Sequence, residues 1–518
     1  MPNRAWTGPL EQIDDYRWRI PQSYDAGMRV PGVIFASEKL LSGIQHDQAL
    51  QQVVNVAHLP GIVQASLAMP DAHWGYGFCI GGIAATDPDA GGVVSPGGVG
   101  FDVNCGISCV RTDLTVEDVQ PKLRTLIATL FNTIPCGVGM SGDIRFTARE
   151  ASRVMTQGSR WAVSHGYGVE ADLEYTESQG CLEGADPDMV SERAVERGKS
   201  QLGTLGSGNH FLEVQAVDTV YDERAVERGR HQLGTLGSGN HFVEVQAIDT
   251  IFDEPAANAF GLSVGQVTLM IHSGSRGFGY QVCDDSLDVM DRAMRQYGIQ
   301  VPDRQLACAP VHSDEGRRYL GAIRCAANFA WANRQCLMHL ARQAFERVFE
   351  KAWEALGMRL IYDVAHNIAK LERHRVDGAE RTLCVHRKGA TRAFPPGHPE
   401  IPADYRALGQ PVIIPGDMGR NSYLLVGAPR AMEESFGTVC HGAGRVMSRA
   451  EAVRRAAGRS IEQELERQGI IVMGRSRKGI AEEQPHAYKD VNDVVHVVHE
   501  AGLARRVARM RPLGVIKG

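Results

Sequence analysis

The sequence lacks the features that mark secreted and membrane-spanning chains. Its 11 cysteines are odd in number, scattered along 518 residues, and include no C-x-x-C pair. The opening stretch MPNRAWTGPLEQIDD has no apolar targeting segment, and no run of about 18 uncharged apolar residues occurs. We therefore expect a reduced, cytoplasmic protein with no membrane partner, whose thiols are buried or bind metal.

Familiar nucleotide-binding motifs are also missing. The chain contains neither the G-x-x-x-x-G-K-[ST] phosphate loop nor a lysine-centred K-x-D-G motif. If the chain activates a nucleotide, it needs another nucleophile, and a neutral histidine is competent near pH 7.

The charge balance gives little indication of a nucleic-acid partner. The net charge is −6, although residues 501–518 carry five basic residues and no acid. Such a patch is enough for phosphate contacts, but a solvated helix end is the more usual explanation for each arginine.

No proline-rich or low-complexity linker divides the chain. Apolar spacing predicts helices over 37–59, 116–132 and 314–352, one beginning near 448 and one within 490–510. Short β-rich runs alternate with loops between and after them. We therefore predict an α/β (mixed α+β) fold over 1–518, one large body whose central sheets are flanked by helices around a deep cleft.

One segment is written twice in tandem. Residues 192–222 and 223–253 match at 25 of 31 positions, and each copy contains QLGTLGSGNHF. Two copies do not make a solenoid, because stacked repeats need at least three units to bury a shared core. We interpret the pair as a single duplication.

Side chains that bind metals recur beside glycine and asparagine at the ends of apolar runs. They stand in FDVNCG, SGNHF, MIHSGSRG, VAHNIAK and VCHGAGR, and are Asp102, Cys105, His210, His241, His272, His366 and His441. One such histidine alone is more typical of a structural residue, but the repeated form favours a site. Carboxylate, imidazole and thiolate together suit Mn²⁺, Zn²⁺ or Fe²⁺ better than Mg²⁺ or Ca²⁺, as one ion or two. GSGNH, HSGSRG and HGAGR also place small residues where backbone N–H groups can face an anion.

Nine separated motifs together are similar to the RtcB-type RNA-splicing ligase family. They are MPDAHWGYGFCIGG, SPGGVGFDVNCG, QLGTLGSGNHF, IHSGSRG, AHNIAK, VHRKGATRAFPPG, IPGDMG, GTVCHGAGR and VIKG. They run in the family's order from about Met69 to Gly518. The resemblance implies an RtcB-like fold with a metal and nucleotide cleft.

The resemblance also implies a reaction. Such an enzyme uses GTP and two Mn²⁺ ions to join an RNA 3′-phosphate or 2′,3′-cyclic phosphate end to a 5′-hydroxyl end, in tRNA splicing or RNA repair. His441 would accept GMP, and the metal ligands would be Asp102, Cys105, one GNH histidine, His272 and His366. The residues expected to hold GTP are Asn209 or Asn240, Glu213 or Glu244, Asn367, Pro415, Gly416, Asp417, Met418, Ser422, Gly442, Ala443, Gly444 and Lys517. Asp417 stands where some members have serine, and an archease-type activator is a further expected partner.

The duplication leaves a choice between His210 and His241. We favour the second copy, because it leaves the connection to the next metal-binding strand without an insertion; the first would then be extruded. Two alternatives remain open at this stage: a two-metal phosphoesterase, and an RNA-binding protein whose catalysis the duplication has impaired.

Overall fold

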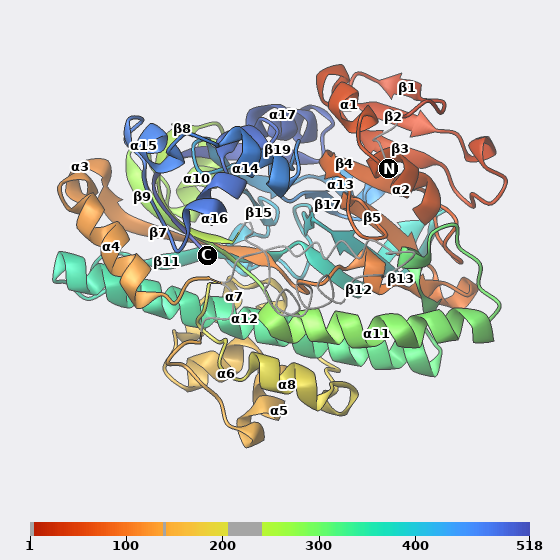
Figure 1. The fold of residues 1–518 in the computed structure, drawn as a ribbon, viewed down its shortest axis with the longest axis horizontal. Coiled ribbons are helices and arrows are strands. Elements are labelled where there is room, and N and C mark those ends of the chain that lie inside the picture. The colour runs from red at the N-terminus through yellow and green to blue at the C-terminus, as the bar shows by residue number, and fades with distance from the viewer. Residues whose placement is uncertain (1–4, 138–140, 206–240) are drawn as a thin grey trace.

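The computed structural model describes residues 5–137, 141–205 and 241–518. These residues form one large body in which β-sheets and helices are mixed (Figure 1). The fold class expected from the sequence is therefore confirmed. Among the described residues, no helix combines the length and hydropathy needed to cross a membrane.

The first large sheet has seven strands in the order β1-β2-β3-β4-β5-β13-β12. Their bounds in that order are Glu11–Asp14, Arg17–Ile20, Gly32–Phe35, Ser66–His73, Ile80–Thr86, Ala379–Lys388 and Asn367–Val376. All pairs are antiparallel except β3 with β4. The sheet thus joins an N-terminal half to a β-hairpin from much later in the chain.

The second large sheet has eight strands, of which seven follow the order β11-β7-β9-β8-β19-β16-β15 and β18 pairs in parallel with β19. Their bounds are Arg359–Ala365, Gly106–Thr115, Gln266–Ser273, Phe242–Ile251, Ala504–Lys517, Ser422–Gly427, Pro411–Ile414 and, for β18, Ile471–Gly474. The central strands β8 and β9 are almost entirely buried although both carry polar residues, which include Glu244 and His272.

Two small ribbons complete the strands of the described chain. Val93–Val94 (β6) pairs with Ala309–Pro310 (β10), and Ala390–Arg392 (β14) pairs with Thr438–Cys440 (β17). Strand β17 matters for the site because its last residue precedes His441.

Helices cover both faces of the second sheet. On one face Val243 and Val245 of β8 share an apolar cluster with α4 and α12, and on the other Phe242 and Ile248 share one with α10 and α15. The α-helices are Glu38–Gln45 (α1), Ala49–Val56 (α2), Val116–Val119 (α3), Leu123–Thr133 (α4), Ala148–Gln157 (α5), Ser159–Ser164 (α6), Glu170–Glu174 (α7), Glu192–Gly198 (α8), Glu254–Phe260 (α10), Arg276–Gln296 (α11), Asp314–Phe349 (α12), Pro429–Glu434 (α13), Arg449–Arg455 (α14), Ile461–Glu466 (α15), Arg477–Glu482 (α16) and Val491–Glu500 (α17).

Helix α12 is a long, largely buried helix against which several other helices pack. It begins at the Ser313 cap, whose Oγ accepts from the Gly316 amide at 3.0 Å, and runs for 36 residues. Figure 1 shows α11 and α12 side by side beneath the sheets, with α5, α6 and α8 below them. Because α12 lies between these layers, its middle is buried almost all round.

The helix predicted within 490–510 is confirmed as α17, and a strand follows it. Helix α17 ends at Glu500, Gly502 adopts a φ of +74°, and residues 504–517 form strand β19. Two of the basic residues of this tail lie on the strand and pair with acids: Arg505 with Asp253 at 2.6 Å and Arg509 with Asp249 at 2.9 Å.

The chain passes directly from the second large sheet to the first through one residue. Strand β11 of the second sheet ends at Ala365, strand β12 of the first begins at Asn367, and His366 lies between them. This junction brings side chains of both sheets to the same buried place.

Candidate metal and nucleotide site

Five predicted ligand residues lie together at this junction, and we call them the ligand cluster: Asp102, Cys105, His241, His272 and His366. Asp102 and Cys105 are in the turn before β7, His241 directly precedes β8, and His272 is in β9. Sequence reasoning placed each histidine after an apolar run, whereas the strand beside His241 follows it. The cluster assembles because β11, β7, β9 and β8 are consecutive neighbours in the second sheet, and each ligand residue lies in or next to one of these strands.

The donor atoms of the ligand cluster converge. The Cys105 Sγ lies 3.2 Å from the Nε2 atoms of both His241 and His272, and the Nε2 atoms of His272 and His366 are also 3.2 Å apart. The His241 Nε2 lies 2.8 Å from the Asp102 Oδ2. Asp102 is itself oriented by the Ser275 amide, which donates to its Oδ1 at 2.9 Å.

Close approach of the backbone shapes this corner. A Cβ on Gly274 would lie 2.2 Å from the Asp102 Oδ1, so a larger residue there would displace the carboxylate. The glycine after His272 and Ser273 therefore makes room for a ligand from another strand.

Burial controls the protonation of the cluster. It lowers the pKa of His272 and of His366 well below the ordinary value and lowers the pKa of His241 despite the opposing Asp102 carboxylate. Burial, reinforced by Asp102, raises the pKa of the Cys105 thiol well above its usual range. The imidazoles are therefore neutral, the form in which histidine donates a lone pair to a metal.

The residues fit a divalent cation. Single donor atoms from Cys105, His241 and His272 all lie within 4.8 Å of one another. Ligands held about 2.0–2.3 Å from a tetrahedral ion are separated by roughly 3.5 Å, close to the spacing seen here. A cation among them would also stabilise the thiolate that burial alone disfavours.

His441 lies next to the ligand cluster, and Asp71 fixes the orientation of its ring. Its ring centroid is 5.0 Å from that of His366, and its Nδ1 lies 2.6 Å from the Asp71 Oδ2. The same carboxylate oxygen accepts from the His441 amide at 3.0 Å. Burial raises the pKa of Asp71, but the attraction of His441 outweighs it and the pKa ends below its ordinary value. An ionised Asp71 keeps the proton of His441 on Nδ1 and leaves the Nε2 lone pair free to react.

The HGAGR segment needs its last glycine. Gly444 has a φ of +73°, and a Cβ there would lie 2.1 Å from the Asp71 carbonyl oxygen. The backbone after His441 is therefore pressed against β4, which carries Asp71.

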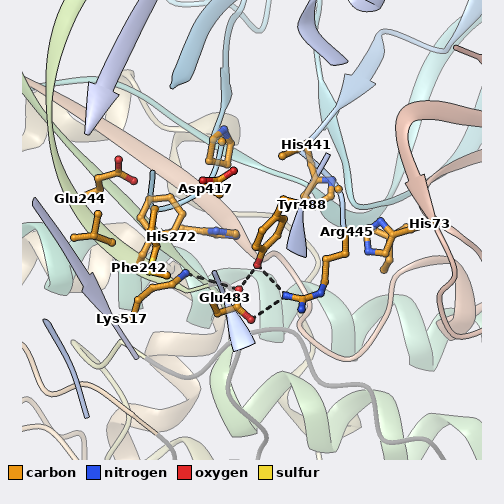
Figure 2. Close-up of a pocket in the computed structure, with 18 of the residues that line it drawn as sticks. His73, Phe242, Glu244, His272, Asp417, His441, Arg445, Glu483, Tyr488 and Lys517 are labelled. Carbon is orange, nitrogen blue, oxygen red and sulfur yellow. Dashed lines mark hydrogen bonds and ion pairs between the residues drawn. The ribbon is translucent and has the colours of Figure 1, made fainter. Parts of the chain in front are cut away.

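A pocket opens beside His441 and joins the predicted nucleotide residues. Its walls include His73, Ile80, Phe242, Glu244, His272, Pro415, Gly416, Asp417, Met418, His441, Gly442, Ala443, Gly444, Arg445, Arg449, Glu483, Tyr488, Val515 and Lys517. Figure 2 shows His441, Arg445 and His73 at one end of this pocket and Glu244 and Lys517 at the other. The next-to-last residue of the chain thus lies in the wall opposite His441.

The far end of the pocket is rich in buried acids. Burial raises the pKa of Glu244 to about 8 and that of Asp417 to about 6, and it lowers the pKa of Lys517. Glu483 differs because Arg445 and Lys517 outweigh its burial and bring its pKa to about 2. This end can offer both hydrogen-bond donors and acceptors to a flat polar ring.

Two predicted nucleotide residues support the site from outside the pocket wall. The Ser422 Oγ accepts from the Gly416 amide at 3.2 Å and so holds the loop that carries Asp417. Asn367 accepts from the Gly389 amide at 2.7 Å and donates to the Asp102 carbonyl at 3.1 Å.

Four predicted site residues lie outside the described residues: Asn209, His210, Glu213 and Asn240. The copy choice is therefore not tested by a comparison of the two. What the structure describes is His241 and Glu244 of the second copy, both in the site.

Sequence reasoning missed several side chains of the site. Asp71 and His73 lie within the quoted motif MPDAHWGYGFCIGG, where an acid and a histidine inside an apolar run are a usable signal. Burial lowers the pKa of His73 to about 3. Arg445, Glu483 and Tyr488 form a hydrogen-bonded group in the pocket wall (Figure 2). Nothing in the local sequence around 483 and 488 indicates this group, because it depends on how α16 packs.

The fold and the site define a class of protein: an α+β protein in which a buried cluster of thiol and imidazole groups adjoins a polar pocket and a histidine paired with an aspartate. Comparison with known proteins gives the family. The family model for tRNA-splicing ligase RtcB matches residues 52–227 and 222–518. A protein of Archaeoglobus fulgidus named tRNA-splicing ligase RtcB is 53% identical over 511 residues, covering 99% of each chain.

Two further relatives agree. The tRNA-splicing ligase RtcB of Thermococcus kodakarensis is 51% identical over 510 residues, 98% of this chain and 99% of that protein. The RNA-splicing ligase RtcB of Mycobacterium tuberculosis is 51% identical over 471 residues, 90% of this chain and all of that protein. The chain belongs to the RtcB family, so the resemblance seen in the motifs is confirmed. The two matched stretches meet at 222–227, where the first copy of the duplicated segment passes into the second.

Proposed function

We propose that this chain is a GTP- and Mn²⁺-dependent RNA ligase that joins an RNA 3′-phosphate or 2′,3′-cyclic phosphate to a 5′-hydroxyl. Membership of the family and the names of its relatives support RNA joining. One observation carries the choice of chemistry: His441, with its Nδ1 held by Asp71, lies between the ligand cluster and the pocket.

In this proposal the His441 Nε2 attacks the α-phosphorus of GTP. A P–N bond forms, the bond to the β-phosphate oxygen breaks, and pyrophosphate leaves. Attack makes the imidazole ring more positive, and the Asp71 carboxylate at Nδ1 stabilises that charge without taking the proton. A 2′,3′-cyclic phosphate end is first opened by water to a 3′-phosphate. The RNA 3′-phosphate then accepts GMP from His441 as the P–N bond breaks, and the 5′-hydroxyl displaces GMP to close the phosphodiester.

The pocket residues divide into two tasks. Gly442, Ala443 and Gly444 are small residues of the pocket wall, and their backbone would lie beside the reacting phosphate. Glu244, Asp417 and Lys517 offer polar atoms for guanine at the opposite end, and Pro415 and Met418 also line the pocket.

The ligand cluster would hold Mn²⁺. Asp102, Cys105, His241, His272 and His366 supply the mixed oxygen, sulfur and nitrogen donors that suit this borderline ion. When bound, the metal supplies positive charge that offsets the charge developing on phosphate oxygens.

The buried state of all 11 cysteines accords with a cytoplasmic location.

Two competing functions make different predictions. A two-metal phosphoesterase would need the ligand cluster but has no use for a histidine held by Asp71. An RNA-binding protein with impaired catalysis would bind RNA without forming a covalent nucleotide adduct.

Incubation with α-labelled GTP and Mn²⁺ separates these functions. We expect an acid-labile covalent label on the wild type and none on His441→Ala. Asp71→Asn should retain metal binding but lower the labelling rate by at least roughly 100-fold, because the amide no longer fixes the reactive tautomer. Absence of label on a metal-loaded wild type would favour hydrolysis, or RNA binding alone, over ligation.

A further inference from the structure

Arg334 of α12 is a buried cation that contacts the backbone of the ligand cluster. Its side chain is fully buried, and its Nε and Nη2 donate to the two carboxylate oxygens of Asp363, each at 2.7 Å. Its Nη1 donates to the Asn104 carbonyl at 2.7 Å and to the Ser273 carbonyl at 3.0 Å. The guanidinium thus contacts strands β11 and β9 of the second sheet and the turn that precedes β7.

Each contacted segment carries a ligand. Asn104 directly precedes Cys105, and Ser273 directly follows His272. Asp363 lies on β11, which leads into His366. One planar group therefore spans the backbone beside three ligand residues that are far apart in the sequence.

The segments are also bonded to each other around this group. The His366 amide donates to the Cys105 carbonyl at 2.8 Å, and the Asn104 amide donates to the Asn367 carbonyl at 2.6 Å. Asn104 itself has a φ of +55°, an unfavourable conformation that its surroundings must maintain. A rigid fork with fixed donor directions is suited to maintaining it, and a flexible lysine is not.

We propose that Arg334 is a positioning residue that sets the spacing of Cys105, His272 and His366 for the metal. It acts through backbone carbonyls and touches neither the metal nor a substrate. The inference rests on the proposed function insofar as the ligand cluster is the metal site. Partners that orient metal ligands typically change metal affinity by roughly 10- to 100-fold when they are removed.

The same helix offers a matched control. Arg342, eight residues further along α12, is also buried and makes a bidentate pair with Asp172 at 2.7 and 2.8 Å. This second pair is similar in burial and geometry, but Asp172 is on α7, and further hydrogen bonds join the pair to Gln335 and the Met358 carbonyl rather than to the ligand cluster. If Arg334 had only a structural role, loss of either ion pair should have the same effect on metal affinity.

The experiment compares two neutralised pairs in the full chain. One variant combines Arg334→Gln with Asp363→Asn, and the control combines Arg342→Gln with Asp172→Asn. Removing both charges of a pair avoids leaving one buried and unpaired, which favours folding of both variants. Thermal unfolding is measured first, without metal, to match their stability.

Metal binding is the deciding measurement. Mn²⁺ affinity is measured by calorimetry, and Co²⁺ is used as a spectroscopic probe of thiolate coordination by Cys105. We expect the Arg334 pair variant to lose roughly 10- to 100-fold in Mn²⁺ affinity and to show an altered thiolate-to-cobalt absorption band. The Arg342 pair variant should retain the wild-type affinity and spectrum.

Each outcome decides the matter. Wild-type affinity and an unchanged cobalt spectrum in the Arg334 pair variant, or equal losses in both variants, would overturn the positioning role. If the Arg334 pair variant does not fold, Arg334→Lys serves instead, and full restoration of the cobalt spectrum by lysine would likewise overturn it. Failure of the wild type itself to bind Mn²⁺ would refute the metal site of the proposed function, which is a distinguishable result.

Discussion

Two buried polar clusters of this protein are built differently. In the ligand cluster, neutral donor atoms of Cys105, His272 and His366 point at one another with separations of 3.2 Å. In the second, Glu372 of β12 and Arg387 of β13 form a bidentate pair at 2.6 and 2.8 Å. The remaining Arg387 bonds go to Thr438 and Phe436, each at 2.9 Å.

The difference shows which buried polar groups require a ligand. The Glu372–Arg387 pair is satisfied by the protein, since opposite charges and hydrogen bonds compensate for burial. The ligand cluster instead brings several electron-pair donors into contact with one another. Such an arrangement is explained by a divalent ion and not by stability of the chain alone.

The largest expected effect separates the two copies of the duplicated segment. His241→Ala should abolish Mn²⁺-dependent labelling by GTP, because it removes a donor that contacts both Cys105 and Asp102. His210→Ala should label like the wild type. The measurement is the initial labelling rate at saturating Mn²⁺, and the reverse result would assign the first copy to the site.

A second prediction concerns Cys105→Ala. Without metal, its free energy of unfolding should change little, because the thiol makes no compensated charge pair. With Mn²⁺ at about 100 times the dissociation constant, the wild type should gain about 2.7 kcal/mol in stability and the variant far less. Equal stabilisation of both proteins in thermal melts would show that Mn²⁺ binds elsewhere.

The opposite behaviour is expected of Glu372→Gln. This change leaves the Arg387 cation buried without its carboxylate and should cost about 3–5 kcal/mol in unfolding free energy. Mn²⁺ should still stabilise the variant by the same increment as the wild type. Denaturant titrations with and without Mn²⁺ measure both quantities, and loss of the metal increment would mean that the two clusters are coupled.

The smallest effect is a pH dependence of the Glu372–Arg387 pair. Burial raises the pKa of Glu372, but Arg387 outweighs it and holds the folded pKa well below the ordinary value. A depressed folded pKa contributes stability above the unfolded pKa of about 4.3, and that contribution is lost as the pH falls further. The stability gap between wild type and Glu372→Gln should therefore narrow below about pH 4, as melts at several pH values will test.

Much of the fold followed from local sequence pattern. The apolar spacing of 314–352 predicted α12, which ends at Phe349, and the β-rich runs after it became β11, β13, β15 and β16. The strand after Gly502 was not predicted, because basic residues interrupt its apolar positions and only a left-handed glycine separates it from α17. Local pattern does not reveal that β19 pairs with β8, some 260 residues earlier in the chain.

The sequence predicted the site residues that stand in recognisable motifs. It did not predict the residues whose role depends on tertiary contacts. Asp102, Cys105, His272 and His366 stand in recognisable motifs, and the structure brings them together. Arg334 stands in an ordinary helical stretch, and only the tertiary structure connects its guanidinium to Asn104 and Ser273. Similarly, the partnership of Asp71 with His441 spans 370 positions and has no local signal that pairs them.

Crystals soaked with Mn²⁺ and measured at the manganese absorption edge would test the central claim most directly. We expect an anomalous peak within bonding distance of the Cys105 Sγ and the Nε2 atoms of His241 and His272. Strong manganese peaks elsewhere, with the three donor atoms left in contact only with each other, would contradict it.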